Sequence, residues 1–264
     1  MKGRVLIVAG SDSGGGAGIQ ADIKAVTALG GYAATAITAL TVQNTRDVYD
    51  IHEVPVDIVR QQMEVVIDDI GVDCIKTGML HRTEVLETVA DVIARKAANV
   101  PLVVDPVMVA KGGARLLDAD TTGVLRDQLI GAATVLTPNL PEAEILSGER
   151  IETDDDQERV GRALCALGPK AVLMKGGHRP GDEMRDVLVT ADGVEVFRSP
   201  RIDTPHTHGT GCTLASAIAT GIAQGLSPRD AVARGRDYVL EAIRTAPGFG
   251  SGHGPLNHAH TVRD

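Results

Sequence analysis

Short aliphatic and β-branched runs alternate with longer segments of helical periodicity along most of the chain. The runs expected to be strands are Arg4–Ala9, Tyr32–Leu40, Val72–Thr77, Leu102–Asp105, Thr134–Pro138 and Ala171–Lys175. The helical patterns cover Gly18–Leu29, Pro55–Ile70, Thr83–Ala98, Asp118–Gln128, Pro141–Ser147 and Asp155–Leu167. Strands separated by helices require βαβ crossovers, so this pattern predicts an α/β fold with a mainly parallel sheet covered on both faces.

The last third of the chain departs from this alternation. Val187–Val196 predicts a hairpin, because Asp192 and Gly193 stand at its centre. Residues 211–246 predict mostly helix. No Pro/Ser-rich linker or repeat divides the 264 residues, so we expect one domain over 1–264, with disorder in the tail from His260 to Asp264.

Composition excludes several classes of protein. The net charge of −9 disfavours binding to a nucleic-acid backbone as the main activity. No apolar run approaches the roughly 18 residues of a membrane span. The three cysteines form no CxxC pair, which favours a reducing compartment, and we expect a cytoplasmic protein.

Polar residues follow several of the predicted strands. Asp105, Lys175, Lys76–Thr77 and Thr137–Asn139 each stand at the carboxyl end of a strand. Open parallel sheets bind ligands beyond these ends, so these side chains are expected to face one crevice.

Residues 10–18, GSDSGGGAG, follow a strand and open a helix. The segment lacks the third glycine of a dinucleotide-binding fingerprint and the GK[ST] ending of a P-loop, so it is weak evidence for a nicotinamide enzyme. Two interpretations stay open. The glycines could only let the chain reverse, or the loop that Gly10 begins could close over a small ligand.

The segment HGTGC (208–212) sits where a loop becomes a helix. Gly209 and Gly211 allow successive backbone N–H groups to converge, and a helix N-terminus favours an anion. Cys212 at this position is expected to lose its proton more easily than a free thiol, whose pKa is about 8.5. A small buried cysteine that packs at a helix start is an equal alternative.

Several sequence blocks along the chain resemble those of a known family. The GTGC turn resembles the anion hole of ribokinase-like small-molecule kinases, in which the last position is usually Asp. Together the blocks resemble the hydroxymethylpyrimidine/phosphomethylpyrimidine kinases of thiamine biosynthesis over essentially the whole chain: GSDSGGGAGIQAD (10–22), ITALTVQNT (37–45), KTGML (76–80), DPVMVAKGG (105–113), TPNLPEAE (137–144), KGGH (175–178) and HGPLNH (253–258).

The resemblance implies a ribokinase-like three-layer α/β/α sandwich and an ATP-dependent kinase that uses Mg²⁺. Its substrate would be 4-amino-5-hydroxymethyl-2-methylpyrimidine, and a second transfer to the monophosphate would give the diphosphate. It also implies a homodimer. A pyridoxal kinase, or an enzyme with both activities, is the nearest alternative, and a non-catalytic ligand sensor is the alternative from another class.

By position, the resemblance makes Cys212 the group that activates the acceptor hydroxyl. It places Gly209, Thr210 and Gly211 in the anion hole and Lys175 in a phosphate-contacting segment. These roles suit phosphoryl transfer, which needs positioning and charge neutralisation. Lys175 could instead only solvate a strand end.

The resemblance also implies the acceptor and metal sites. Gln43 and Asp22 would hydrogen-bond the aminopyrimidine, and Met79 would line its ring. An amide such as Gln43 offers both a donor and an acceptor to such a ring. Without the resemblance, Gln43 would be part of a polar loop and Met79 a core residue, and Asp22 could equally be an exposed helix residue.

Asn139, Glu142 and Asp105 would hold Mg²⁺, partly through water. On spacing alone, Glu142 could equally be an acidic residue in the first turn of a helix, where the helix dipole favours it. Asp105 could only cap a turn before Pro106.

Overall fold

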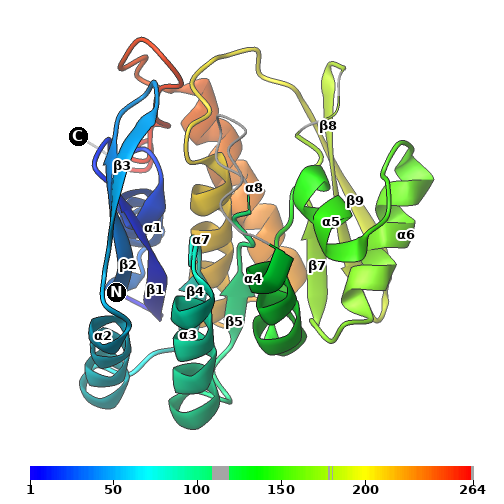
Figure 1. Cartoon of the computed structure of the whole chain (residues 1–264). Helices are drawn as coiled ribbons and strands as arrows, with labels where there is room; N and C mark the ends of the chain where they lie inside the picture. Colours follow the sequence, from blue (N-terminus) through cyan, green and yellow to red (C-terminus); the bar gives the residue numbers. More distant parts are fainter. Residues whose placement is uncertain (109–118, 178, 180, 263–264) are drawn as a thin grey trace.

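The computed structural model describes residues 1–108, 119–177, 179 and 181–262. Within these residues, nine strands form one sheet in the order β3-β2-β1-β4-β5-β6-β7-β8-β9 (Figure 1). The strands are β1 (Arg4–Asp12), β2 (Tyr32–Gln43), β3 (Val48–Glu53), β4 (Cys74–Thr77), β5 (Leu102–Val104), β6 (Val135–Leu136), β7 (Ala171–Met174), β8 (Glu183–Thr190) and β9 (Gly193–Pro200). The six central strands, in the order β2-β1-β4-β5-β6-β7, pair in parallel. At the two edges, β3 is antiparallel to β2, β8 to β7 and β9 to β8.

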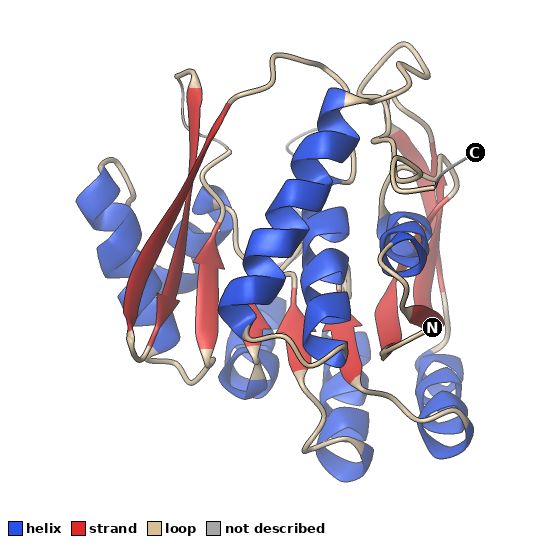
Figure 2. Ribbon diagram, turned by 180° about the vertical axis from the view of Figure 1, so that it is seen from behind, coloured by secondary structure: helices blue, strands red, loops and turns tan. Residues whose placement is uncertain are grey.

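Helices cover both faces of the sheet (Figure 2). They are α1 (Gly18–Ala28), α2 (Val56–Asp69), α3 (Thr83–Lys96), α4 (Ala119–Val124), α5 (Leu140–Ser147), α6 (Asp154–Cys165), α7 (Thr210–Ala223) and α8 (Pro228–Arg244). A π-helical turn at Leu125–Leu129 and a 3-10 turn at Ile130–Ala132 follow α4. Among the described residues, no helix is both long and apolar enough to cross a membrane.

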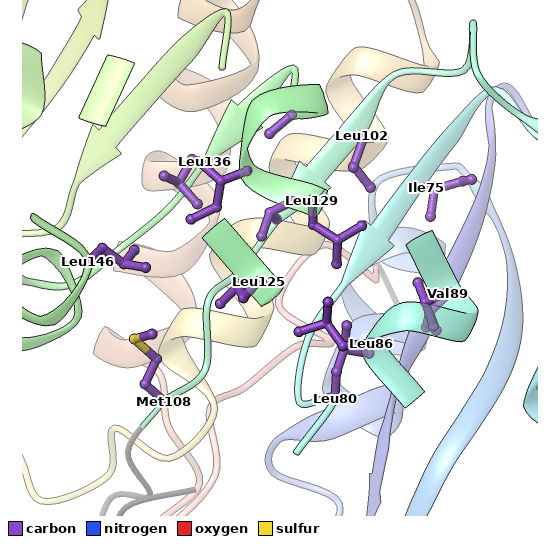
Figure 3. Packing of buried hydrophobic residues seen from close by; sticks show 14 of the residues in the cluster. Ile75, Leu80, Leu86, Val89, Leu102, Met108, Leu125, Leu129, Leu136 and Leu146 are labelled. Carbon is purple, nitrogen blue, oxygen red and sulfur yellow. The ribbon is translucent and has the colours of Figure 1, made fainter. Parts of the chain in front are cut away.

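Alternate residues of β1 feed two separate cores. Leu6 and Val8 belong to a core that also includes side chains of α2, α3, α5 and α6, and Figure 3 shows its leucine-rich packing. Val5 and Ile7 point to the other face and belong to a second core, with side chains of α1, α7 and α8. Each fully buried aliphatic side chain stabilises the fold by about 1.5–3 kcal/mol. The result is the predicted three-layer α/β/α sandwich of the ribokinase-like class.

The sequence-based elements agree with the structure within a few residues, with one strand missed. Val48–Glu53 forms the edge strand β3, which was not predicted. Of the segments considered in the sequence, residues 109–113, 118, 178 and 263–264 lie outside the described residues. In the tail, His260 is held rather than free, since its Nε2 lies 3.0 Å from the Tyr238 carbonyl oxygen.

Candidate active site

The turn before α7 has the geometry of an anion hole. Gly209 is the N-cap residue at φ 80°, in the left-handed region. A Cβ there would lie 1.8 Å from the Gly16 carbonyl oxygen, so only glycine fits. Because Gly209 has no side chain to cap the helix, the first-turn N–H groups of Gly211 and Cys212 are left for a ligand. The macrodipole of α7 adds positive potential at the same point.

Asp105 at the end of β5 and Lys175 at the end of β7, the two strands that flank β6, converge on Gly211. A Cβ on Gly211 would lie 3.4 Å from Lys175 Nζ and 3.6 Å from Asp105 Oδ2. Lys175 Nζ donates to Asp105 Oδ1 at 2.9 Å, and Thr137 Oγ1 donates to the same oxygen at 3.1 Å. Polar side chains at the carboxyl ends of β5, β6 and β7 therefore meet, as expected, whereas Lys76 and Thr77 at the end of β4 are buried.

Both groups of this pair are charged. Burial alone would lower the pKa of Lys175, but the charges of Asp105 and Glu142 raise it overall. Burial would raise the pKa of Asp105, yet Lys175 and Lys76 hold it below its usual value. The centre thus presents a fixed ammonium beside the uncapped helix end.

Asn139 and Glu142 form a capping box at the start of α5. Asn139 Oδ1 accepts from the Glu142 N–H at 2.9 Å, and a Glu142 carboxylate oxygen accepts from the Asn139 N–H at 2.8 Å. Burial raises the pKa of Glu142 to about 7, against the opposing charge of Lys175. The N-x-x-E spacing therefore has a structural role here. In the described part of the chain, no three His, Cys, Asp or Glu side chains cluster in a way that could hold a metal.

Cys212 is half-buried in the first turn of α7. The expectation of a readily ionised thiol is wrong, because burial raises the pKa of Cys212 to about 11. Lys76 and the Gly18 N–H act in the opposite direction but do not offset this desolvation. Cys212 is a neutral thiol near pH 7.

Behind Cys212 lies a buried polar cluster that sequence reasoning missed. Lys76 Nζ lies 2.9 Å from both carboxylate oxygens of Asp22, and both side chains are 0% exposed. Ser216, one turn after Cys212 on α7, donates to Asp22 Oδ1 at 2.7 Å. Burial opposes the charge on Lys76, but Asp22, Cys212 and Asp105 raise its pKa overall. Asp22, expected to bind substrate, is fully enclosed by these partners. The signal for the pair was a lysine inside a strand and an aspartate inside an apolar helix pattern.

Three residues expected to bind the acceptor lie near this centre. A Cβ on Gly10 would lie 2.6 Å from Met79 Cε, so these two residues are in direct contact. Gln43 is half-buried at the end of β2. Its backbone N–H donates to Ser13 Oγ and its carbonyl accepts from the same hydroxyl, each at 2.8 Å.

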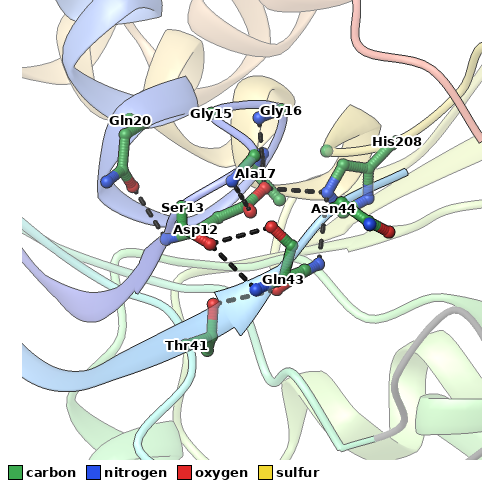
Figure 4. Close-up of polar contacts among 12 residues, drawn as sticks. Asp12, Ser13, Gly15, Gly16, Ala17, Gln20, Thr41, Gln43, Asn44 and His208 are labelled. Carbon is green, nitrogen blue, oxygen red and sulfur yellow. Dashed lines mark hydrogen bonds and ion pairs between the residues drawn. The ribbon is translucent and has the colours of Figure 1, made fainter. Parts of the chain in front are cut away.

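Asp12 organises the glycine-rich loop (Figure 4). It is 3% exposed and accepts from the backbone N–H groups of Gly14, Gly16 and Ala17 at 2.8–3.1 Å. Asp12 Oδ2 also lies 2.8 Å from His208 Nε2, next to the anion hole. Sequence reasoning missed this residue, although an aspartate within a glycine run is a signal for side-chain capture of backbone N–H groups.

The segment around residues 253–258 completes the turn. The His208 N–H donates to the Gly254 carbonyl at 3.1 Å. Thr213 Oγ1 lies 2.8 Å from the Gly209 carbonyl oxygen and 2.9 Å from His258 Nε2. Burial lowers the pKa of His258 to about 4, so this imidazole is neutral at pH 7. The anion hole is thus supported by segments from both ends of the sequence.

Fold and site together define a ribokinase-like small-molecule kinase. In agreement, the pyridoxal kinase of Bacillus subtilis, solved as an ADP complex, matches with a TM-score of 0.91 and 36% identity over 98% of both chains. A family model described as phosphomethylpyrimidine kinase matches residues 12–257. The chain belongs to the phosphomethylpyrimidine kinase family.

Two curated relatives show the same relationship. The hydroxymethylpyrimidine/phosphomethylpyrimidine kinase of Streptomyces coelicolor is 48% identical over 96% of this chain and 93% of its own. The thiamine biosynthesis bifunctional protein ThiED of Geobacter sulfurreducens is 50% identical over 100% of this chain. The chain spans only 54% of the length of that bifunctional relative.

Proposed function

We propose that the chain is a single-domain, ATP-dependent kinase that phosphorylates 4-amino-5-hydroxymethyl-2-methylpyrimidine and then its monophosphate, in thiamine biosynthesis. The observation that carries this proposal is the convergence of Lys175 and Asp105 on the uncapped start of α7 at Gly211. The family match and the names of the curated relatives supply the substrate class.

The chain's own residues serve phosphoryl transfer by position and charge. The N–H groups of the Gly209–Cys212 turn and the Lys175 ammonium would stabilise the charge that spreads over the phosphoryl oxygens. The shape of the turn fits, since a Cβ at Gly211 would enter the space between the helix end and Lys175.

Mg²⁺ bound with ATP would neutralise phosphate charge. Asp105, Asn139 and Glu142 would hold it, and their oxygen atoms suit this ion. Asn139 and Glu142 are partly engaged in their capping box, and burial raises the pKa of Glu142 to about 7. This donor set fits an ion that arrives with the nucleotide and keeps several waters, not one held by a protein cage.

The acceptor would lie between Gln43, Met79 and Gly10, with its hydroxyl near Cys212. A neutral Cys212 would orient the acceptor hydroxyl for attack, and a loose transition state needs little removal of the hydroxyl proton before the transfer. Asp22 would act from behind, by holding Lys76 next to the sulfur.

The experiment is an ADP-release assay with three acceptors in parallel: the pyrimidine alcohol, its monophosphate and pyridoxal. ADP release with the first two supports the proposal. ADP release with pyridoxal alone would favour the second candidate function, a pyridoxal kinase. The similarity to the pyridoxal kinase of Bacillus subtilis is the observation that supports this candidate. If none of the three acceptors causes ADP release, the remaining interpretation is a non-catalytic ligand sensor.

Two further properties belong to this proposal. A cytoplasmic location agrees with three free cysteines. A homodimer agrees with the exposed apolar side chains Leu40, Val42, Tyr49 and Ile51 on β2 and β3. Light scattering on the purified protein tests the oligomeric state, and a monomer at micromolar concentration would contradict the homodimer.

A further inference from the structure

Two nitrogen atoms face each other beside the glycine-rich loop. Gln43 Nε2 lies 3.3 Å from His208 Nε2, which itself lies 2.8 Å from Asp12 Oδ2. An ionised carboxylate only accepts hydrogen bonds, so Asp12 requires a proton on His208 Nε2. A protonated ring nitrogen cannot accept from the Gln43 amide. The histidine therefore cannot satisfy Asp12 and an amide nitrogen at the same time.

Asp12 is ionised in this setting. Burial acts to raise its pKa, but the hydrogen bonds from His208 and from backbone N–H groups lower it overall. The carboxylate also accepts from three loop N–H groups, which a protonated acid would satisfy less well.

Exchanging the two ends of the Gln43 amide satisfies every partner. The oxygen and nitrogen of an amide are assigned from the network that they complete. In the exchanged orientation, the single proton on His208 Nε2 is shared between Asp12 Oδ2 at 2.8 Å and the amide oxygen at 3.3 Å, as a bifurcated hydrogen bond. The nitrogen then donates to Thr41 Oγ1, which lies 3.1 Å from the other end of the amide. Thr41 Oγ1 in turn keeps its single proton for the Ser11 carbonyl at 2.9 Å. Two separate contacts thus favour one orientation.

We propose that Asp12 and His208 are positioning residues for acceptor recognition, and that they hold the Gln43 amide with its oxygen toward His208. This inference rests on the proposed function for the identity of the acceptor. After its contacts to His208 and Thr41, the amide keeps one oxygen lone pair and one N–H. A heterocycle with a ring nitrogen beside an exocyclic amine matches that pair. Since His208 precedes Gly209, the same network links acceptor recognition to the anion hole.

The state of His208 is tested directly, with no ligand present. Protein labelled with ¹⁵N-histidine gives long-range ¹H–¹⁵N correlations that show which ring nitrogen carries the proton. We expect a proton on Nε2 in the wild-type protein, because Asp12 Oδ2 can only accept. An unprotonated Nε2 in the wild-type protein would overturn the proposal.

Two substitutions of His208 then distinguish the loss of the Nε2 hydrogen-bond donor from the loss of the ring itself. The amide nitrogen of Gln in His208→Gln reaches the place of Nε2, whereas that of Asn in His208→Asn reaches only the place of Nδ1. Calorimetry without nucleotide should show pyrimidine affinity within about threefold of wild type for His208→Gln. It should fall about tenfold or more for His208→Asn, which loses a charge-assisted hydrogen bond.

Controls and contrary outcomes are equally defined. His52→Gln and His52→Asn, on the exposed strand β3, should leave the affinities for the pyrimidine and for ATP unchanged. Equal losses in the two His208 variants, or equal losses of ATP and pyrimidine affinity, would contradict the positioning role. If the wild-type protein neither binds nor phosphorylates the pyrimidine, the proposed function fails, while the ligand-free histidine measurement still decides the orientation of Gln43.

Discussion

Lys76 and Asp22 form an ion pair inside the protein, with the Lys76 ammonium 2.9 Å from both carboxylate oxygens and no exposed surface on either side chain. One residue comes from β4 and the other from α1, so the pair joins the sheet to the helix layer that carries the anion hole. Ser216 links the same carboxylate to α7.

Removing one charge of this pair should be costly, because the other charge stays buried without its partner. We expect Lys76→Met and Asp22→Asn each to lower the free energy of unfolding by about 3–5 kcal/mol, measured by urea denaturation. The double variant should lose less than the sum. Arg229→Met, which breaks an exposed pair with Glu195, should cost no more than about 1 kcal/mol. Additive losses would show that the two charges are not coupled.

The raised pKa of Cys212, about 11, predicts its reactivity. The thiolate is the reactive form, so alkylation by iodoacetamide should accelerate about tenfold per pH unit between pH 7 and pH 10. The Cys165→Ser background removes the other half-buried thiol. A plateau below pH 9 would contradict the raised pKa.

The catalytic role of Cys212 is tested by its removal. Cys212→Ala should lose most of its turnover while folding normally and binding ATP. Turnover near the wild-type value, measured by ADP release, would remove the residue from the mechanism.

Glu142 predicts a pH-dependent stability. Its pKa is raised to about 7 in the folded protein, against about 4.3 in an unfolded chain. The folded state therefore binds the extra proton between these values, and the resulting stability is lost as the pH rises from about 4.5 to 7. Glu142→Gln keeps the capping box but has no proton to lose.

The difference in unfolding free energy between wild type and Glu142→Gln should thus change by on the order of 3 kcal/mol across this window. Urea denaturation at pH 5, 6, 7 and 8 measures it. Glu87→Gln, on an exposed position of α3, controls for the loss of a charge. A pH-independent difference would refute the raised pKa.

Gly209 and Gly211 should respond differently to the same substitution. Gly209→Ala places a Cβ 1.8 Å from the Gly16 carbonyl oxygen at φ 80°. We expect a loss of stability of about 2 kcal/mol or more, because both the clash and the left-handed backbone are strained. Gly211→Ala meets Lys175 only at 3.4 Å and should fold well. Its methyl group narrows the anion hole, and kcat should fall about 100-fold. Thermal melts and ADP release measure the two effects, and an active Gly211→Ala variant would argue against this anion site.

Gln43→Ala should raise the KM for the pyrimidine more than the KM for ATP, because the amide is expected to contact only the acceptor. Steady-state kinetics with each substrate varied in turn provide the measurement. Gln61→Ala, at an exposed position of α2, is the matched control. Equal increases in both KM values would exclude a recognition role.

The sheet and the meeting of its polar strand ends were predictable because their signals are local. Apolar runs ending in Asp105 and Lys175 indicate buried parallel strands with polar carboxyl ends, and the structure brings these two side chains to 2.9 Å. The edge strand β3 was missed because five of its six residues are exposed, which removes the apolar alternation of a half-buried strand.

The electrostatics of the site were not predictable in the same way. A helix N-terminus alone favours a thiolate at Cys212, but the desolvation that raises its pKa comes from packing between distant segments. Likewise, Asp22 and Lys76 are 54 residues apart, and only the fold shows that they neutralise each other.

The anion hole is supported by residues 253–258, and this has a consequence for folding during translation. A nascent chain can pair β1 with β2 early, but Gly209 lacks its brace from Thr213 and His258 until residue 258 has emerged from the ribosome. Translation arrested before that point would yield a largely formed sheet that is not yet competent to handle a nucleotide.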